Sequence, residues 1–256
     1  MATIISSEEV ERSEISGQSA PGPDGILVQQ WRKVPTGMKV VLFNLFLWTD
    51  DFPECLLQAR TILLPKSEIP STPAEFRPIS ISSVVMRHYH KILAQRIQKV
   101  IKIAPQQRAF QCADGLAENL SLLSEVLYSA SSQLRSTYMA VLDVKKAFDT
   151  VQHVPLLNIL RSRGAPFLIL RHIHKIYAQG TTSIQLPGQV LKGIPVHQGV
   201  RQGDPLSPVL FNIVMDSALA KLNPNVGVQL GNDTISYLAF ADDVILMARS
   251  STRPSI

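Results

Sequence analysis

Two apolar runs flank a pair of carboxylates, Asp242 and Asp243, in the stretch Ile235-Ser-Tyr-Leu-Ala-Phe-Ala-Asp-Asp-Val-Ile-Leu-Met-Ala248. This pattern predicts a β-hairpin with the acids at its turn. Adjacent like charges at the end of buried strands raise each other's cost of ionisation, and a divalent cation would remove that conflict. The plainer interpretation is a solvated turn, because Asp is an ordinary turn residue.

A second apolar strand also ends in a carboxylate, Asp143, within Ser136-Thr-Tyr-Met-Ala-Val-Leu-Asp-Val-Lys-Lys-Ala-Phe-Asp149. If the two acid-tipped segments are neighbours in one sheet, three carboxylates meet at one point. Such a cluster can hold two metal ions roughly 3.5–4 Å apart, which clamp an in-line phosphoryl displacement. The pair of segments therefore indicates polymerase chemistry.

Between the acids lies a glycine- and proline-rich segment, Val200-Arg-Gln-Gly-Asp-Pro-Leu-Ser-Pro-Val-Leu-Phe-Asn-Ile-Val-Met-Asp216. Gly203 allows a close backbone approach, and Ser207 can cap a helix that has Pro208 at its first position. A glycine loop before a helix is weak evidence of function by itself, and a purely structural cap is the favoured explanation of it.

Taken together, these segments resemble the three palm motifs of reverse transcriptases, in the family's order: Asp143-Val-Lys-Lys-Ala-Phe-Asp149, Arg201-Gln-Gly-Asp-Pro-Leu-Ser-Pro208 and Phe240-Ala-Asp-Asp243. Three upstream segments resemble the fingers motifs and the sequence before them: Pro21-Gly-Pro-Asp-Gly-Ile26, Arg60-Thr-Ile-Leu-Leu-Pro-Lys66 and Phe76-Arg-Pro-Ile-Ser80. The residues in these motifs look like those of non-LTR retrotransposons, most like those of elements that insert at a fixed site in ribosomal DNA. The resemblance covers roughly residues 20–250.

The resemblance implies a right-hand α+β polymerase fold, with an antiparallel palm sheet backed by helices. We expect one reverse transcriptase domain fragment over residues 1–256. It divides into an N-terminal extension (1–54), a mainly fingers part (55–136) and a mainly palm part (137–256). Because only thirteen residues follow Asp243, we expect a C-terminal truncation with the thumb missing.

The resemblance also implies roles for the acids. Asp143 and Asp242 would bridge two Mg²⁺ ions, and the carbonyl of Val144 would complete one coordination shell. Asp243 would tune the site more than it ligates. Magnesium fits because oxygen ligands and phosphates are its preferred shell. Asp149 is a competing metal candidate, although a helix cap at the turn is the favoured role for it.

Five further residues match positions that contact the nucleotide in the family: Lys66, Arg77, Phe148, Gln202 and Gly203. Arg77 and Lys66 would hold the triphosphate, because a guanidinium fork matches phosphate oxygens and a lysine acts as a mobile point charge. The ring of Phe148 would lie beneath the sugar and exclude a 2′-hydroxyl. A plain core aromatic is the alternative for Phe148.

Charge is unevenly distributed although the formal net charge is only +5. Residues 60–108 carry nine Lys and Arg against two acids, whereas the first fifteen residues are acidic. We expect a nucleic-acid face on the fingers, with a solvated helix face as the alternative for residues 87–102. Arg201 would contact backbone phosphate, or else a surface acid.

Composition fits one domain with a sizeable core, since 45% of the 256 residues are hydrophobic. Cys55 and Cys112 show no metal-site spacing and demand no disulfide, which favours a reduced, intracellular protein. The polar start shows no signal peptide, and the longest apolar stretch, residues 40–48, is too short to cross a membrane. For a retroelement of this class the nucleus is the expected compartment.

The predicted function is an RNA-directed DNA polymerase that joins deoxynucleotides to a DNA primer on an RNA template. The alternative is a catalytically idle relic that only binds nucleic acid. An RNA-dependent RNA polymerase fits less well, because that group typically carries Gly before its Asp pair. A maturase encoded by a mobile intron stays open within the first class, and oligomeric state is left undetermined.

Hydrophobic periodicity and the positions of proline and glycine predict the remaining helices and strands. We expect a short strand over 60–65, a loop over 67–78 and a hairpin formed by 181–186 and 190–195. Helical spacing is found over 26–50 (interrupted near 35–37), 83–103, 116–134, 156–163 and 166–178.

Overall fold

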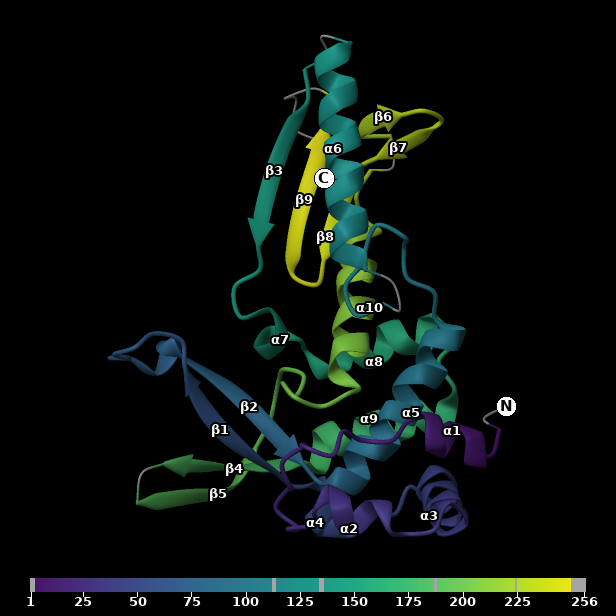
Figure 1. Cartoon of the computed structure of the whole chain (residues 1–256), viewed down its shortest axis with the longest axis vertical. Helices are drawn as coiled ribbons and strands as arrows, with labels where there is room; N and C mark the ends of the chain where they lie inside the picture. The colour runs from purple at the N-terminus through teal and green to yellow at the C-terminus, as the bar shows by residue number, and fades with distance from the viewer. Residues whose placement is uncertain (1–2, 112–113, 134–135, 187, 224, 250–256) are drawn as a thin grey trace. The chain divides into compact units, whose positions relative to one another are not determined.

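The computed structural model describes residues 3–111, 114–133, 136–186, 188–223 and 225–249. The chain forms two compact units (Figure 1). Unit 1 consists of residues 1–101 and 148–210, and unit 2 of residues 102–147 and 211–256. Both units combine helices with a sheet, which confirms the predicted α+β class.

The sheet of unit 1 has four strands in the order β2-β1-β4-β5. Strand β1 (Ala59–Pro65) pairs antiparallel with β2 (Phe76–Ser82) and parallel with β4 (Thr181–Leu186), which forms a hairpin with β5 (Gln189–Pro195). The predicted strand and hairpin are confirmed. The loop predicted to reach Pro78 is wrong, because β2 already begins at Phe76 after a short 3₁₀ turn, η1 (Pro73–Glu75). β2 is an edge strand, where a proline is tolerated.

Helices form the core of unit 1: α2 (Val28–Arg32), α3 (Thr36–Thr49), α4 (Glu54–Leu57), α5 (Val84–Val100), α8 (His153–Ser162) and α9 (Phe167–Gln179). The predicted helices of this region are confirmed within a few residues. α5 begins where the hydroxyl of Ser83 accepts a hydrogen bond from the N–H of Val85 at 3.1 Å. Its side chain Tyr89 is fully buried among the rings of Phe43, Phe46 and Phe52.

The acidic N-terminus packs on the basic helix α5. Helix α1 (Ser7–Arg12) starts with a capping box between Ser6 and Glu9. Glu9 also accepts hydrogen bonds from the guanidinium of Arg96 at 2.7 and 2.8 Å, and Arg87 donates to the carbonyl of Ala20. Arg87 and Arg96 are 8% and 9% exposed. These two charges therefore anchor the N-terminal segment, and the nucleic-acid face predicted for this helix is wrong at both positions.

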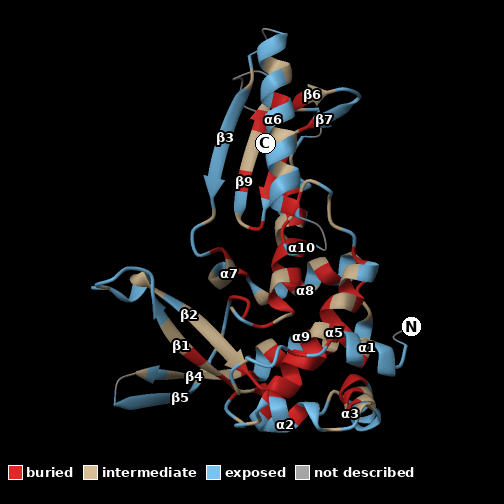
Figure 2. Cartoon of the chain, in the orientation of Figure 1, coloured by how far each residue is buried: buried red, intermediate tan, exposed pale blue. Residues whose placement is uncertain are grey.

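Unit 2 carries a three-stranded antiparallel sheet in the order β3-β9-β8. β3 (Tyr138–Asp143) lies at one edge, β9 (Asp243–Ala248) in the centre and β8 (Tyr237–Phe240) at the other edge. Helix α6 (Gly115–Ser132) packs its Val126 with Leu238 and Met247, and β3 is exposed along its whole length (Figure 2). The predicted hairpin and the antiparallel sheet backed by a helix are both confirmed.

The remaining elements are α7 (Ala147–Thr150), α10 (Ser207–Leu219) and the short hairpin of β6 (Val228–Leu230) with β7 (Asp233–Ile235). The two units divide the chain at other points than the predicted fingers and palm boundaries, which stay a prediction. Among the described residues, none of the helices combines the length and apolarity that a membrane span requires. Cys55 is a free, exposed thiol, and Cys112 lies outside the described residues.

Candidate active site

Two predicted catalytic carboxylates face each other at one end of the sheet of unit 2. Asp143 is the last residue of β3, Asp243 is the first of β9, and the two are direct partners in the antiparallel register. Direct partners have Cα atoms about 4.5 or 5.5 Å apart, and their side chains project from the same face of the sheet. Both residues are exposed. The register thus brings together the two segments that the sequence could only propose as neighbours.

Asp242 lies in the two-residue turn between β8 and β9. Phe240 and Asp243 close the hairpin as a register pair, so Ala241 and Asp242 form the loop. Two-residue hairpin loops favour turns with positive φ, because their twist matches that of the strands. Ala241 indeed has a φ of 58°. Asp242 is half-buried and lies next to the Asp143–Asp243 pair in sequence and in the sheet.

The donor set at this strand end suits a magnesium ion that shares its shell with a substrate. No cluster of three or more His, Cys, Asp or Glu able to hold a metal occurs among the described residues. Magnesium is commonly bound through one or two carboxylates, with waters and substrate phosphates completing the octahedron. Asp143, Asp242 and Asp243 meet that smaller requirement, and Val144 follows Asp143 directly.

In unit 1, the loop that contains Gln202 and Gly203 packs against strand β2. The carbonyl of Gln202 accepts a hydrogen bond from the N–H of Ser80 at 2.8 Å. Gly203 has a φ of +101°, and a Cβ there would lie 2.8 Å from the carbonyl oxygen of Ser80. The glycine is therefore required for a close approach between two parts of the chain, whatever else it contacts.

Gln202 also bonds Asp149. Its side-chain amide donates to the carboxylate of Asp149 at 2.8 Å. Asp149 lies inside the short helix α7 and not at its start, so the helix cap expected for it is wrong. The bond instead joins the glycine loop to the segment that follows Asp143 in the sequence.

Lys66 and Arg77 are both exposed near the end of the β1–β2 hairpin. Arg77 pairs in register with Leu64, and the backbone N–H of Lys66 donates to the carbonyl of Glu75 at 2.8 Å. The ammonium of Lys66 donates to the carbonyl of Ala74 at 3.2 Å. The hairpin thus presents two cations close together at one end.

Arg201 is placed differently from the expectation. It is 7% exposed, and its guanidinium donates to the carbonyl of Leu57 at 3.0 Å inside unit 1. Burial lowers the pKa of Arg201, although Asp204 opposes that effect. A surface phosphate contact does not match this environment, and neither does pairing with a surface acid.

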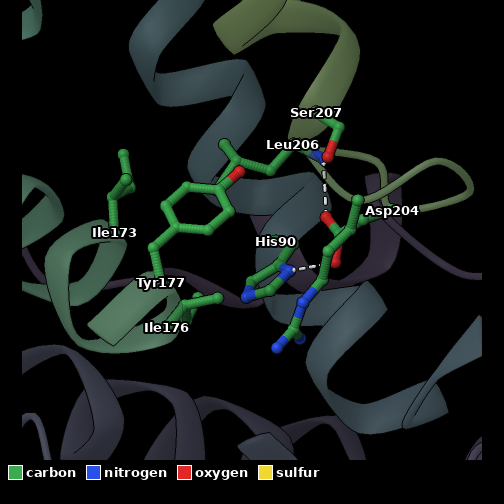
Figure 3. A pocket seen from close by; sticks show the side chains of 8 residues that line it. His90, Ile173, Ile176, Tyr177, Asp204, Leu206 and Ser207 are labelled. Atoms are coloured by element: carbon green, nitrogen blue, oxygen red, sulfur yellow. Dashed lines mark hydrogen bonds and ion pairs between the residues drawn. The ribbon is translucent and has the colours of Figure 1, made fainter. Parts of the chain in front are cut away.

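A buried polar network holds the start of helix α10 in unit 1 (Figure 3). Nδ1 of His90 donates to Asp204 at 2.6 Å, and the other oxygen of Asp204 accepts from the N–H of Leu206 at 2.9 Å. Nε2 of His90 lies 3.1 Å from Nε2 of His172, so one proton is shared between the two rings. The other face of His172 approaches Asp50, with 3.8 Å between Nδ1 and Oδ1.

Burial dominates the ionisation of this network. It lowers the pKa of His172 to about 4, against the opposing influence of Asp50. Burial would raise the pKa of Asp204, but His90, the N–H of Leu206 and the charge of Arg201 together hold that pKa below its ordinary value. His172 is therefore neutral at pH 7, and Asp204 is a charged anchor within the glycine loop.

Most of the chain matches one known protein family. Residues 64–254 match the family described as "Reverse transcriptase (RNA-dependent DNA polymerase)". The chain belongs to the reverse transcriptase family. This match covers the acid-tipped strands, the glycine loop, strand β2 and only the last two residues of β1. Members of this family generally use divalent metal ions.

Similar reverse transcriptases include the "Retrovirus-related Pol polyprotein from type-1 retrotransposable element R2" of Nasonia vitripennis, 42% identical over 96% of the chain. The type-2 R2DM polyprotein of Drosophila melanogaster is 39% identical over 97% of the chain. The chain covers 24% of the length of each of these relatives. The resemblance to non-LTR elements of the R2 class is thereby confirmed.

Solved structures support the fold. The apo telomerase of Candida tropicalis superimposes with a TM-score of 0.53 over 78% of the chain and 40% of its own length, at 13% identity. At that identity the likeness concerns the fold alone, and it agrees with a palm and fingers arrangement.

Sequence reasoning missed two residues that support candidate segments, one in each unit. Asp204 stands inside the quoted glycine-loop segment, but its partner His90 is 114 positions away and no periodicity connects them. Gln107, whose side chain bonds the turn that contains Asp242, lies in a segment without a regular pattern. Neither signal can be read without knowing which residues are neighbours.

Proposed function

We propose that the chain carries the polymerase site of an RNA-directed DNA polymerase, which joins deoxynucleotides to the 3′-hydroxyl of a DNA primer on an RNA template. The observation that carries the proposal is the register pairing of Asp143 with Asp243, with Asp242 in the adjoining turn, in a member of the reverse transcriptase family. This places three acids at one strand end, as two-metal phosphoryl transfer requires.

Asp143 and Asp242 hold two Mg²⁺ ions in this proposal, with the carbonyl of Val144 as a further ligand. Asp243 tunes the site through its charge. When bound, the ions neutralise negative charge that develops on the reacting phosphate and activate the primer hydroxyl. The pairing of two exposed acids at the strand end supports this assignment, because an ion removes the repulsion between neighbouring carboxylates.

Lys66 and Arg77 bind the triphosphate, which the exposure of both cations at one hairpin end supports. Gln202 and Gly203 line the nucleotide and template side. Phe148, half-buried in α7, selects deoxynucleotides, because its ring would clash with a 2′-hydroxyl. The bond between Gln202 and Asp149 supports a joint role, since Asp149 directly follows Phe148.

In the reaction, the 3′-oxygen of the primer forms a bond to the α-phosphorus of the nucleotide. The bond from that phosphorus to the β-phosphate oxygen breaks, pyrophosphate leaves, and the hydroxyl proton passes to solvent. Little covalent chemistry falls to the protein, so positioning and electrostatic stabilisation provide most of the acceleration.

The partners are an RNA template, a DNA primer or target and deoxynucleoside triphosphates. The similarity to R2 polyproteins supports an intracellular, nuclear place of action. Four Lys or Arg of the basic segment, Arg60, Arg87, Lys91 and Arg96, bind the N-terminal segment instead. The template face therefore rests on other cations such as Lys66 and Arg77.

Primer extension tests this function. The purified chain is incubated with a DNA primer on an RNA template, Mg²⁺ and deoxynucleotides, beside an Asp242→Asn variant. Extension that disappears in Asp242→Asn supports the proposal. If a folded chain retains the template–primer in a gel-shift assay but adds no nucleotide, the alternative of an idle nucleic-acid-binding relic is favoured.

A further inference from the structure

A buried glutamine grips the backbone of the turn that carries Asp242. Gln107 is 1% exposed, and its side chain makes two hydrogen bonds with Ala241. Its Oε1 accepts from the N–H of Ala241 at 2.9 Å, and its Nε2 donates to the carbonyl of Ala241 at 3.1 Å. One amide therefore satisfies both backbone groups of the residue that precedes Asp242. All of these atoms belong to unit 2.

Ala241 needs such support because its backbone is strained. Its φ of 58° lies in the left-handed region, which a glycine adopts freely and an alanine does not. Residues held in this region persist where the surrounding structure over-determines them. Ala241 is buried, at 6% exposure, so water is a poor substitute for the lost bonds.

The segment around Gln107 is itself fixed along β8. The N–H of Ala239 donates to the carbonyl of Gln106 at 2.9 Å, and the N–H of Arg108 donates to the carbonyl of Ala239 at 3.0 Å. The carbonyl of Ala109 accepts from the side-chain amide of Asn212 at 2.7 Å. The glutamine thus reaches the turn from a rigid base, which a positioning group requires.

We infer that Gln107 is a positioning residue that sets the place of the Asp242 carboxylate through the backbone of Ala241. The inference rests on the proposed function, in which Asp242 holds a divalent cation. Outer groups that orient ligands typically change metal affinity or activity by 10–100-fold when they are removed. Because Gln107 acts through one backbone residue, we expect an effect of about tenfold.

Binding of Mn²⁺ to the whole chain, measured by the loss of the free-ion EPR signal, tests the inference without requiring turnover. Gln107→Met keeps the length and apolar volume of the side chain and removes both hydrogen bonds to Ala241, together with the bond that Oε1 accepts from the N–H of Ala109 at 3.3 Å. We expect its dissociation constant to rise about tenfold. The matched control is Gln106→Met, since Gln106 joins the ladder through its backbone carbonyl, and its dissociation constant should stay within about twofold.

Asp242→Asn in the same Mn²⁺ titration distinguishes a failure of the proposed metal site from a failure of the positioning role of Gln107. If Asp242→Asn binds Mn²⁺ as the unchanged chain does, the proposed metal site fails. If Asp242→Asn weakens binding and a folded Gln107→Met does not, the positioning role alone is overturned.

The substitution Ala241→Gly provides a second test, in which Gln107→Met is also compared with the unchanged glutamine in an Ala241→Gly background. Glycine accepts a positive φ without steric cost, so the turn then depends less on the hydrogen bonds from Gln107. We expect Gln107→Met to weaken Mn²⁺ binding by about threefold or less in an Ala241→Gly background, compared with tenfold in the original. An equal loss in both backgrounds would show that Gln107 does not act through the turn.

Discussion

At the residue scale, Phe148 and His172 illustrate two kinds of side chain: a candidate for substrate contact and a member of a buried network. Phe148 is half-buried in a short helix, one residue before the Asp149 that bonds Gln202. His172 is 1% exposed and shares a proton with His90. The first is a candidate for direct contact with substrate, whereas the second belongs to the buried network that includes Asp204 of the glycine loop.

Phe148→Ala should relax sugar selection. Without the ring, a ribonucleotide loses its steric penalty, and the ratio of ribonucleotide to deoxynucleotide incorporation should rise roughly 10–100-fold. Single-nucleotide incorporation on an RNA template with each nucleotide measures this ratio. Phe167→Ala, at a ring that is 72% exposed, is the control. An unchanged ratio in a folded Phe148→Ala chain would contradict the assignment.

His172 should make the fold sensitive to acid. Burial lowers its pKa from 6.5 to about 4, so the unfolded chain binds a proton at pH 5 that the folded chain does not. This contribution of His172 to the free energy of unfolding is fully present above pH 6.5 and is lost as the pH falls towards 4. At pH 5 the loss is about 2 kcal/mol, which corresponds to a Tm roughly 4–8 °C lower.

Thermal unfolding between pH 7.5 and 5, followed by circular dichroism, measures this loss. His172→Gln should show a clearly shallower fall of Tm than the unchanged chain, while His197→Gln, at an exposed position, should not. Parallel pH dependences for all three proteins would show that His172 is not the group responsible.

At the element scale, strand β2 and the glycine loop make a tightly constrained contact in unit 1. The N–H of Ser80 bonds the carbonyl of Gln202, and the carbonyl of Ser80 occupies the space that a Cβ at Gly203 would need. β2 is an edge strand, so the loop covers backbone groups that would otherwise be unpaired. The loop is thereby fixed to the hairpin that carries Lys66 and Arg77.

Gly203→Ala should destabilise the fold. The positive φ alone costs about 1–3 kcal/mol for a residue with a side chain, and the new Cβ would collide with a backbone oxygen. Urea unfolding measures the change. Gly188→Ala is a matched control, because Gly188 has a φ of +74° but open space around it. Equal losses at both positions would mean that the contact with Ser80 contributes nothing.

The sequence predicts those elements whose signal is local. The hairpin around Asp242 and Asp243, the helix after Ser83 and the hairpin around Gly188 all follow from alternation, caps and turn residues close together in the chain. The β1–β4 pairing, the Asp204–His90 bond and the grip of Gln107 on Ala241 join residues more than 100 positions apart. No periodicity encodes such pairs.

Burial of charge is the other feature that the sequence does not reveal. Arg87, Arg96 and Arg201 are basic residues in a protein that resembles a nucleic-acid enzyme, which suggests phosphate contacts. Each is instead buried and bonded to backbone carbonyls or to Glu9. An arginine can satisfy several carbonyls at once through its five N–H groups, and a helical pattern does not distinguish that use from a surface one.

At the scale of the whole molecule, the proposed residues are shared by two compact units. The three acids belong to unit 2, while Lys66, Arg77, Phe148 and the glycine loop belong to unit 1. The chain corresponds to about a quarter of the R2 polyproteins that it resembles. The central proposal is that the acids at the strand end of unit 2 catalyse nucleotide transfer.

Single-turnover addition of one deoxynucleotide to a primer on an RNA template tests this claim most directly. The unchanged chain is compared with Asp143→Asn, Asp242→Asn, Asp243→Asn and, as a control, Asp233→Asn at an exposed position of β7. We expect rates lowered on the order of 10³-fold or more for Asp143→Asn and Asp242→Asn, about tenfold for Asp243→Asn, and unchanged for Asp233→Asn. Equal rates for all five folded proteins would contradict the account.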